Sequence, residues 1–512
     1  MSFLGLDIGT TGCKALLLSS EGEVLSLAYR EYPLVYPKLG WAELDPVAVW
    51  DAVREVLSEV ASRAGSDKVR ALSVSSHGES VTPIGSEGIP LYNTITSLDN
   101  RTVQFTRLWE EEFGRSRLEG ITGIPLHHKH SINRIMWLRR HEPEVYHKTW
   151  KFMCYEDFII YKLGLGPVID PSLAARTMAY DARRGRWSEE ILSFADVDLR
   201  LLPDIQASGM PVGVLSERAA EEVGLAKGVL VVAGGHDQPC AALGAGITDS
   251  GPSADSIGTA EALIAVLSPS AANHRLLAQG YPCYPHVVPE KTVTISVNPN
   301  AGALFRWYRD NIAADERREA LAAGKSVYDL IVERCHKQPS EVYVLPHFTG
   351  SGTPSPNPRL RGAIVGLGLG TTRHDIAWAI LESQAFELRI NVTTLKQSGV
   401  DISKVVAVGG AAKSLDALRL RADVLGLPVV VPMIREAACL GAAMLAGYGT
   451  REYSSLQQAA ASLVRVATVL EPDPETARAY DQKFGAYCRI RSTMGELGVE
   501  PGSSIGGMDG GL

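Results

Sequence analysis

The sequence lacks the features of secreted and membrane-spanning proteins. It contains only seven cysteines in 512 residues, an odd number with no Cys-x-x-Cys pair, which indicates reduced thiols rather than a disulfide framework. No apolar run approaches the roughly eighteen residues that a membrane helix needs. Residues 1–20 have no basic beginning and carry Asp7 within their apolar part, so they do not resemble a signal peptide.

Positive charge is also scarce relative to negative charge. The 50 lysines and arginines are outnumbered by 58 aspartates and glutamates, and the acidic residues are scattered along the chain. A surface for nucleic acid or anionic lipid would show clustered lysine and arginine. These absences predict a cytoplasmic globular protein that has neither a nucleic acid nor a membrane as its partner. The length exceeds what one core accommodates, so two domains are expected.

Short β-rich runs alternate with helical patterns, which indicates an α/β fold. Three consecutive strands are expected at the start of the chain, joined by the turns GTTG and SEGE. A helix follows, with Asp45 as its N-cap and Pro46 in its first turn. The expected strands cover residues 2–9, 13–20, 23–32, 69–76 and 227–235, and the expected helices cover 45–65, 134–150 and 155–164.

The same plan returns in the second part of the chain. Residues 248–255 (TDSGPSAD) are predicted to be a boundary, because Gly, Ser and Pro gather there. The I-G-T triplets at residues 8–10 and 257–259 then open two strand–turn–strand patterns. Two strand–Gly-Gly–helix patterns also occur, one in each part. We therefore expect two similar domains facing each other across a cleft, over residues 1–247 and 255–450, followed by C-terminal helices and a disordered glycine-rich tail over 451–512.

The stretch DIGTTGCK, residues 7–14, is a candidate phosphate-binding hairpin. Its glycines flank Thr10 and Thr11, and a tight turn of this kind points N–H groups and hydroxyls at one spot. Lys14 adds a positive charge, and Asp7 is placed to hold Mg²⁺ through water. An ordinary hairpin explains the same residues, so that alternative stays open. No G-x-x-x-x-G-K-[ST] motif occurs, which excludes a P-loop enzyme.

Asp237 stands in an unusual place, after Gly234 and Gly235 and between an apolar strand and a helix of small residues. A charge there is either the N-cap of the helix or part of a site.

Two other patterns are not expected to be sites. The three histidines 127, 128 and 130 have no carboxylate or cysteine at ligand spacing, so we expect loop residues rather than a zinc site. The run GLGLGTT lacks the dinucleotide-binding spacing and is expected to precede a helix capped by Thr372 and Asp375.

Taken in order, DIGTTGCK, the GGHD turn, DSIGT and VGGAAKS resemble the FGGY family of carbohydrate kinases. Residues 362–382 are similar to the second signature of that family, and residues 124–146 and 170–192 are most similar to its pentulose-kinase branch. The resemblance covers about residues 3–450. It implies a duplicated actin-like, ribonuclease H-like ATPase fold in which MgATP and a small sugar meet in the cleft. The implied reaction is phosphorylation of a hydroxyl of D-xylulose or a related ketose.

The resemblance also implies a role for individual residues. Asp237 would be the base that takes the proton from the attacking hydroxyl, and the helix N-terminus beside it is expected to favour its ionised form. The double glycine before it would let the substrate approach the backbone. The remaining implied contacts are Asp7 with Mg²⁺, Thr10, Thr11, Lys14, Gly258 and Thr259 with phosphates, Gly409, Gly410 and Lys413 with the nucleotide, and His77, Glu79, Asp99, Arg101 and Gln238 with the sugar, Arg101 holding either the loop or the substrate.

The loop SSHGES departs from two branches of the family. Xylulose kinases typically read S-G-Q-M-H-G and glycerol kinases S-N-Q-R-E-T, so Glu79 stands where the former have His. A carboxylate at Glu79 would accept hydrogen bonds from two sugar hydroxyls, or it is a solvated loop charge. The alternatives are a kinase for glycerol, erythritol or gluconate, an actin-like ATPase without sugar transfer, and a relative that binds sugar without transfer. The oligomeric state stays open, with a homodimer as one alternative.

Overall fold

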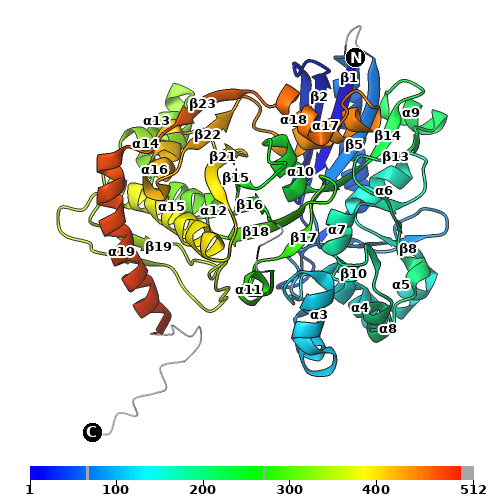
Figure 1. Ribbon diagram of the computed structural model, residues 1–512, viewed down its shortest axis with the longest axis horizontal. Helices are drawn as coiled ribbons and strands as arrows, with labels where there is room; N and C mark the ends of the chain where they lie inside the picture. The colour runs from blue at the N-terminus through cyan, green and yellow to red at the C-terminus, as the bar shows by residue number, and fades with distance from the viewer. Residues whose placement is uncertain (65–67, 269–270, 272, 497–512) are drawn as a thin grey trace.

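The structure is a computed structural model that describes residues 1–64, 68–268, 271 and 273–496. The predicted glycine-rich tail, residues 502–512, lies outside the described residues. Two β-sheets, each flanked by helices, lie side by side (Figure 1). The blue and cyan first part of the chain forms one half, and the yellow part and the red C-terminal helix lie in the other.

The first sheet has six strands in the order β13-β14-β5-β1-β2-β3. Its strands are β1 (Ser2–Ile8), β2 (Gly12–Ser19), β3 (Val24–Glu31), β5 (Val69–Ser76), β13 (Pro211–Val214) and β14 (Leu230–His236). β1, β2 and β3 form an antiparallel meander, whereas β5 pairs in parallel with β1, and β14 in parallel with β5. The three expected N-terminal strands are therefore confirmed.

The second sheet repeats this arrangement and has one additional edge strand, β17. Its order is β17-β18-β16-β15-β21-β22-β23, so β15, β16 and β18 correspond to the first meander, and β21 and β22 to the parallel strands. Its strands are β15 (Gly251–Ile257), β16 (Glu261–Val266), β17 (Cys283–Pro285), β18 (Thr292–Asn298), β21 (Ile402–Val408), β22 (Val429–Pro432) and β23 (Val466–Leu470). The predicted duplicated α/β fold is confirmed. β15 begins at Gly251, inside the segment expected to be a boundary, and β23 joins the sheet from the expected C-terminal region.

Helices cover the two sheets (Figure 1). In the first half they are α1 (Pro46–Ser62), α2 (Val103–Leu108), α3 (Arg115–Thr122), α4 (Ser131–His141), α5 (Pro143–Lys148), α6 (Tyr155–Lys162), α7 (Pro171–Ala175), α8 (Glu189–Ala195), α9 (Glu217–Val223) and α10 (Asp237–Gly244). The later helices are α11 (Asn273–Ala278), α12 (Gly302–Asn311), α13 (Ala314–Ala323), α14 (Val327–Glu333), α15 (Arg373–Gln397), α16 (Leu415–Leu425), α17 (Ala437–Gly449), α18 (Leu456–Leu463) and α19 (Pro474–Glu496).

Local capping chemistry sets several of these helix ends. The Asp45 carboxylate accepts a hydrogen bond from the Val47 amide, and Thr372 forms a capping box with Asp375, as expected. The run 134–150 was expected to be helical throughout, which is wrong. It divides into α4 and α5 because Pro143 begins a new helix and restricts the residue before it, and residues 149–150 enter strand β8 (Thr149–Met153).

Two helices interlock the halves. α10 follows β14 of the first sheet but packs on β15 and β16 of the second, whereas α17 follows β22 of the second sheet but packs on β1, β5 and β14 of the first. The two helices also pack against each other. Gly441 of α17 lies so close to α10 that a Cβ atom there would stand 1.9 Å from the Cys240 carbonyl oxygen. This crossing brings the N-termini of both helices to the junction of the halves.

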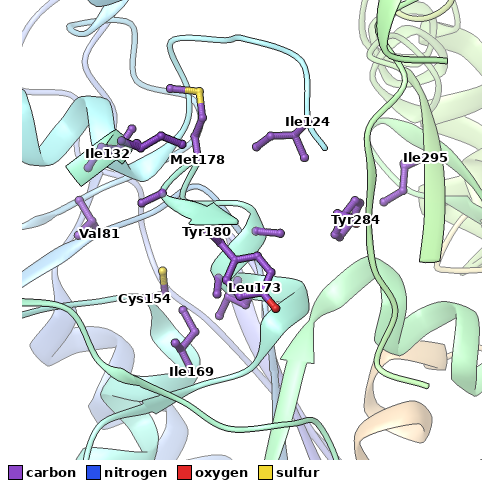
Figure 2. Packing of buried hydrophobic residues seen from close by; sticks show 14 of the residues in the cluster. Val81, Ile124, Ile132, Cys154, Ile169, Leu173, Met178, Tyr180, Tyr284 and Ile295 are labelled. Atoms are coloured by element: carbon purple, nitrogen blue, oxygen red, sulfur yellow. The ribbon is translucent and has the colours of Figure 1, made fainter. Parts of the chain in front are cut away.

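An apolar cluster also spans the junction. Figure 2 shows Tyr284 and Ile295, on strands of the second half, facing Ile124 and Tyr180 of the first half. All four side chains are buried. The hydrophobic core is therefore continuous between the halves on the side of β17, next to the candidate site described below.

Candidate functional site

A cavity of about 140 Å³ lies between the two halves. Its lining comes from both of them: the end of β1, the start of β2, the start of α10, the ends of β15 and β21, and the start of α17. The lining residues are Asp7, Lys14, Asp237, Gln238, Ala241, Ser256, Val408, Gly409, Arg435, Glu436, Ala437, Ala438 and Cys439. Helix N-termini attract anions, so two of them at one cavity suit a phosphate ligand.

Five of the residues predicted from the sequence meet in this cavity. Asp7 and Lys14 come from neighbouring strands, Asp237 and Gln238 from the first turn of α10, and Gly409 from the opposite half. The Asp7 Oδ1 atom accepts a hydrogen bond of 2.8 Å from Ser75 Oγ. Burial raises the pKa of Asp7, although the Ser75 hydrogen bond and the charge of Lys14 act in the opposite direction.

The threonine hairpin lies beside the cavity, outside its lining. The Gly9 amide donates to the Gly12 carbonyl over 2.9 Å, and the Tyr32 hydroxyl donates to the Gly9 carbonyl over 2.5 Å. Thr10 is half-buried and Thr11 is exposed. The hairpin is therefore fixed through its backbone.

Two turns of the second half pack on each other across from the hairpin. Gly409 has a φ of +92° and follows β21, and the Ala411 amide donates to the Ile257 carbonyl over 3.1 Å. Ile257 leads directly into the turn that contains Gly258 and Thr259. Gly258, Thr259, Gly410 and Lys413 are exposed next to the cavity, so of these predicted nucleotide residues only Gly409 lines it.

Asp237 is the first residue of α10, and it does not act as the N-cap of that helix. His236 holds the cap position, without a side-chain cap bond. The Asp237 side chain is 24% exposed, and its Oδ1 atom lies 3.1 Å from His236 Nε2 but accepts no hydrogen bond from a described residue. Burial, together with the negative charges of Asp7 and Glu79, raises the pKa of Asp237 to about 8. This differs from the expectation that the helix N-terminus keeps the group ionised.

The two glycines before Asp237 serve packing. Strand β14 has one extra residue relative to β5 between Val232 and Gly235, which makes a β-bulge. A Cβ atom on Gly234 would stand 1.9 Å from the Val74 carbonyl oxygen, and one on Gly235 would stand 2.4 Å from Val287 Cγ1. The expectation that these glycines admit substrate to the backbone is therefore wrong: their open sides are filled by the protein.

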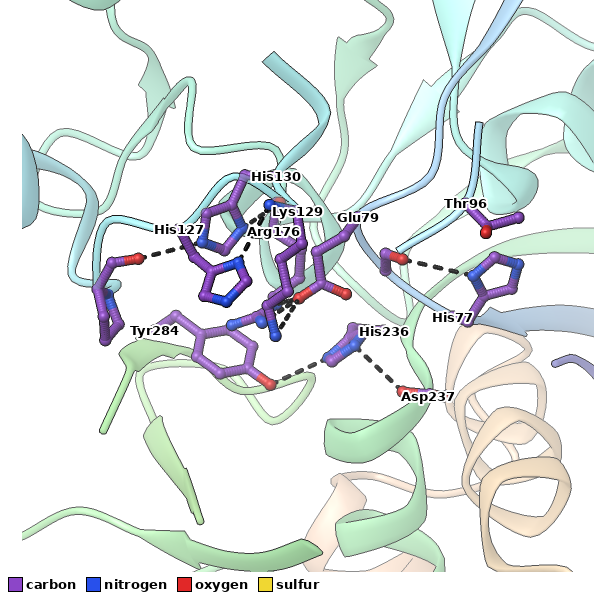
Figure 3. Close-up of polar contacts among 12 residues, drawn as sticks. His77, Glu79, Thr96, His127, Lys129, His130, Arg176, His236, Asp237 and Tyr284 are labelled. Carbon is purple, nitrogen blue, oxygen red and sulfur yellow. Dashed lines mark hydrogen bonds and ion pairs between the residues drawn. The ribbon is translucent and has the colours of Figure 1, made fainter. Parts of the chain in front are cut away.

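Glu79 is the centre of a buried charge cluster, and His236 lies between this cluster and Asp237 (Figure 3). The residue is 7% exposed and has a φ of +59°. Its Oε1 atom accepts hydrogen bonds from Nε (2.9 Å) and Nη2 of Arg176, and Lys129 Nζ lies 3.5 Å from the same atom. Burial alone would raise the pKa of Glu79, but the charges of Arg176 and Lys129 lower it well below its usual value. The alternative of a solvated loop charge is therefore wrong.

His236 and Tyr284 connect this cluster to the second half. The Tyr284 hydroxyl and His236 Nδ1 are 3.0 Å apart, and the Arg176 guanidinium lies 5.1 Å from the centre of the Tyr284 ring. Burial and the charge of Arg176 lower the pKa of His236 to about 3, so its ring is neutral. His130 is also buried, and one ring nitrogen faces the Arg176 carbonyl oxygen. The residues of this cluster are far apart in the sequence, so the sequence alone gives no sign that they meet.

Three predicted sugar residues lie apart from this cluster. His77 packs its ring on Tyr155 and points away from Glu79 (Figure 3). Asp99 is fully buried, and its oxygens accept hydrogen bonds from Arg101 and the Ala42 amide, so the expectation that it binds sugar hydroxyls is not met. Arg101 holds the loop, which was one of its two predicted roles.

Other residues of the site carried no recognisable signal in the sequence. Arg435 and Glu436 line the cavity, and the Arg435 guanidinium makes no hydrogen bond or ion pair with a described residue.

Within the described ranges, no three or more His, Cys, Asp or Glu side chains gather as a metal site. The helices in those ranges are also too short or too polar to cross a lipid bilayer.

Two sequence models of the FGGY family of carbohydrate kinases match the chain. The model of the N-terminal domain matches residues 2–244, and the model of the C-terminal domain matches residues 254–450. The two matches together account for most of the sequence and fall on the two halves that carry the two sheets.

Individual proteins are similar over the same extent. The xylulose kinase of Staphylococcus xylosus is 26% identical over 95% of this chain and 99% of its own length. The glycerol kinase of Gloeobacter violaceus is 31% identical over 88% of each chain. The crystal structure of the xylulose kinase from Rhodospirillum rubrum has a TM-score of 0.84, covering 97% of this chain and 99% of that chain at 25% identity.

Proposed function

The chain belongs to the FGGY family of carbohydrate kinases, and we propose that it transfers the terminal phosphoryl group of ATP to a hydroxyl of D-xylulose or a related ketose. Membership confirms the resemblance drawn from the glycine motifs. We assign the base and the sugar site to residues 1–247 and the nucleotide to residues 255–450. ATP as phosphoryl donor agrees with the cytoplasmic location expected from the sequence.

The observation that carries this proposal is the cavity shared by the two halves. It joins a carboxylate of raised pKa, Asp237, to a lysine and two helix N-termini that suit phosphate groups. Phosphoryl transfer has a loose transition state, so the enzyme mainly positions the reactants and stabilises charge. Asp237 orients the attacking hydroxyl and accepts its proton as the new bond forms.

The remaining phosphate and nucleotide contacts follow from position. We assign Lys14, Thr10 and Thr11 to the phosphates from the first half, and Gly258 and Thr259 from the second. Gly409, Gly410 and Lys413 are assigned to the adenosine side. Arg435 joins this set, because its guanidinium lines the cavity without a partner among the described residues.

The residues present fit a magnesium ion that ATP brings with it. Asp7 is a cavity carboxylate, and the described residues offer no dense cluster of protein ligands. Mg²⁺ in such sites is held by one or two carboxylates, water and substrate phosphates. Asp7 would hold it through water. When bound, the ion neutralises charge on the phosphate oxygens.

The polar atoms near Asp237 favour a substrate that carries several hydroxyl groups. Asp237 Oδ1 and Gln238 Oε1 are buried acceptors without a partner among the described residues. The hydrogen bonds that Glu79 accepts from Arg176 both fall on its Oε1 atom. Acceptors need donors, which hydroxyl groups supply. A site built this way rejects analogues that lack the hydroxyl.

The test is a coupled assay of ADP release with D-xylulose, other ketopentoses, glycerol, erythritol and gluconate. We expect ADP release that depends on a ketose, with formation of a sugar phosphate. ATP hydrolysis that is unaffected by every sugar would support the actin-like ATPase instead.

Asp237→Asn should bind ATP as the wild type does and lose about 10²–10⁴-fold in kcat, the usual contribution of a general base. Near wild-type turnover in this variant would remove Asp237 from the role.

A further inference from the structure

The backbone that carries Asp237 is held by two side chains from outside its sheet. At the bulge of β14, the Gly234 amide donates to Glu156 Oε1 over 2.8 Å. Two residues further on, the His236 amide donates to Ser172 Oγ over 2.9 Å. Glu156 and Ser172 are both fully buried. In the last residues before Asp237, two backbone amides therefore donate to side chains and not to a neighbouring strand.

These two contacts belong to one rigid unit. The second oxygen of Glu156, on α6, accepts from the Asp170 amide over 3.0 Å. Asp170 caps α7 by accepting from the amides of Ser172 and Leu173, each over 2.8 Å. Ser172 lies on α7 and Glu156 on α6, so both helices hold residues 234–236 of β14 through hydrogen bonds. A displacement of either helix would move the backbone before Asp237.

Burying the Glu156 carboxylate in this position has a free-energy cost. Burial and the neighbouring Asp170 raise its pKa well above the usual value. Both of its oxygens are used on backbone amides, one of which is the Gly234 amide left over by the bulge. A buried amide without a partner is itself destabilising, by about 1–3 kcal/mol. Glu156 thus accepts a hydrogen bond from the Gly234 amide, which the bulged strand leaves without a backbone acceptor.

We propose that Glu156 and Ser172 are positioning residues, which hold residues 234–236 in the bulged form and so direct the Asp237 carboxylate into the cavity. The inference rests on the proposed kinase function of Asp237. Proton transfer depends on placement, and an error of about 1 Å costs on the order of 10²-fold in rate. Neither side chain lines the cavity, so both act through the backbone of β14.

The first variant is Glu156→Gln. A carboxamide keeps the shape but has one acceptor oxygen, so its NH₂ group must face one of the two backbone amides. We expect kcat to fall about 10–100-fold with KM for ATP within about twofold of the wild type. Ser172→Ala removes only a hydroxyl and should lower kcat in the same direction. It carries the test if Glu156→Gln does not fold.

Asp157→Asn is the matched control. Asp157 neighbours Glu156 on α6, is equally buried, and its Oδ2 accepts from the Cys154 amide, away from β14. Its other oxygen has no partner among the described residues, so the amide keeps the contact. We expect kcat within about twofold of the wild type. Equal losses of kcat in Asp157→Asn and Glu156→Gln would overturn the proposal, as would unchanged kcat in both Glu156→Gln and Ser172→Ala.

Hydrogen exchange separates this inference from the proposed function. The amides of Gly234 and His236 should exchange at least tenfold faster in Glu156→Gln, with exchange elsewhere in the first sheet unchanged. If the wild type phosphorylates no sugar, the proposed function fails, and the exchange rates still decide whether Glu156 holds the bulge. Unchanged exchange at these two amides would refute the positioning role.

Discussion

Removing the charge of Glu79 should destabilise the first half of the protein strongly. The side chains of Glu79 and Arg176 are 9% and 8% exposed, and no other carboxylate among the described residues pairs with Arg176. Breaking a buried ion pair by removing one partner costs about 3–5 kcal/mol, because the other charge stays buried without compensation. Glu79→Gln keeps an acceptor oxygen, so we expect about 3 kcal/mol, at the lower end of that range.

Urea and thermal unfolding measure this cost. A loss of about 3 kcal/mol corresponds to a decrease in Tm of roughly 6–12 °C for a unit of this size. The double variant Glu79→Gln/Arg176→Met should recover part of the loss, since it also removes the buried guanidinium that the single variant leaves without a carboxylate. Glu217→Gln is the control: it breaks an exposed pair with Lys227 and should change stability by less than about 1 kcal/mol.

The pH dependence checks the same reasoning. The pKa of Glu79 is lowered in the folded state, so its stabilisation is present above its ordinary pKa and is lost as the pH falls. The difference between wild type and Glu79→Gln should be complete at neutral pH and shrink below pH of about 4. The reasoning fails if Glu79→Gln loses less than about 1 kcal/mol, or if the double variant is no more stable than the single one.

Three further outcomes follow from the cavity and the helix crossing. The kcat/KM of the wild type should rise with pH as Asp237 loses its proton near pH of about 8, and Asp7→Asn, which removes a negative charge beside Asp237, should move this rise to lower pH while lowering the rate. Arg435→Ala should reduce kcat/KM for ATP about tenfold, whereas the exposed Arg419→Ala should stay within about twofold. Gly441→Ala should lower stability by about 1–3 kcal/mol, because its Cβ atom would stand 1.9 Å from the Cys240 carbonyl, whereas Gly120→Ala, with open space around it, should not be destabilising. A Gly441→Ala protein as stable as the wild type would show that α10 and α17 can separate without cost.

Local signals predicted much of the architecture. Alternating apolar residues and glycine turns indicated β1, β2 and β3, and the same pattern at β15 and β16 indicated the duplication. These features depend on residues within a few positions of one another. The helix caps at Asp45 and Thr372 were read in the same way. Each element followed from its own sequence, so the fold class needed little long-range information.

The contacts that organise the site depend on long-range packing, and the sequence did not reveal them. Glu79 and Arg176 are 97 positions apart, and Glu156 and Gly234 are 78 apart. The polar segment around Asp99 was expected to face the sugar, but Trp41 and the buried Arg101 enclose it. A short polar run is typical of an exposed loop, and only the packing of distant aromatic residues around it makes it part of the core.

The topology explains why the site residues are so scattered. β1, β5 and β14 are parallel, so their carboxyl ends, which precede the hairpin, the loop of Glu79 and Asp237, meet at one edge of the first sheet. The ends of β15 and β21 meet in the same way at the edge of the second sheet. Ligands of open parallel sheets bind outside such edges. Here two edges face each other, and α10 and α17 cross between them. Rotation of the halves about that crossing would change the distance from Asp237 to the Gly409 turn while leaving Asp237 and Asp7 together, so closure would act on the phosphate donor and not on the base.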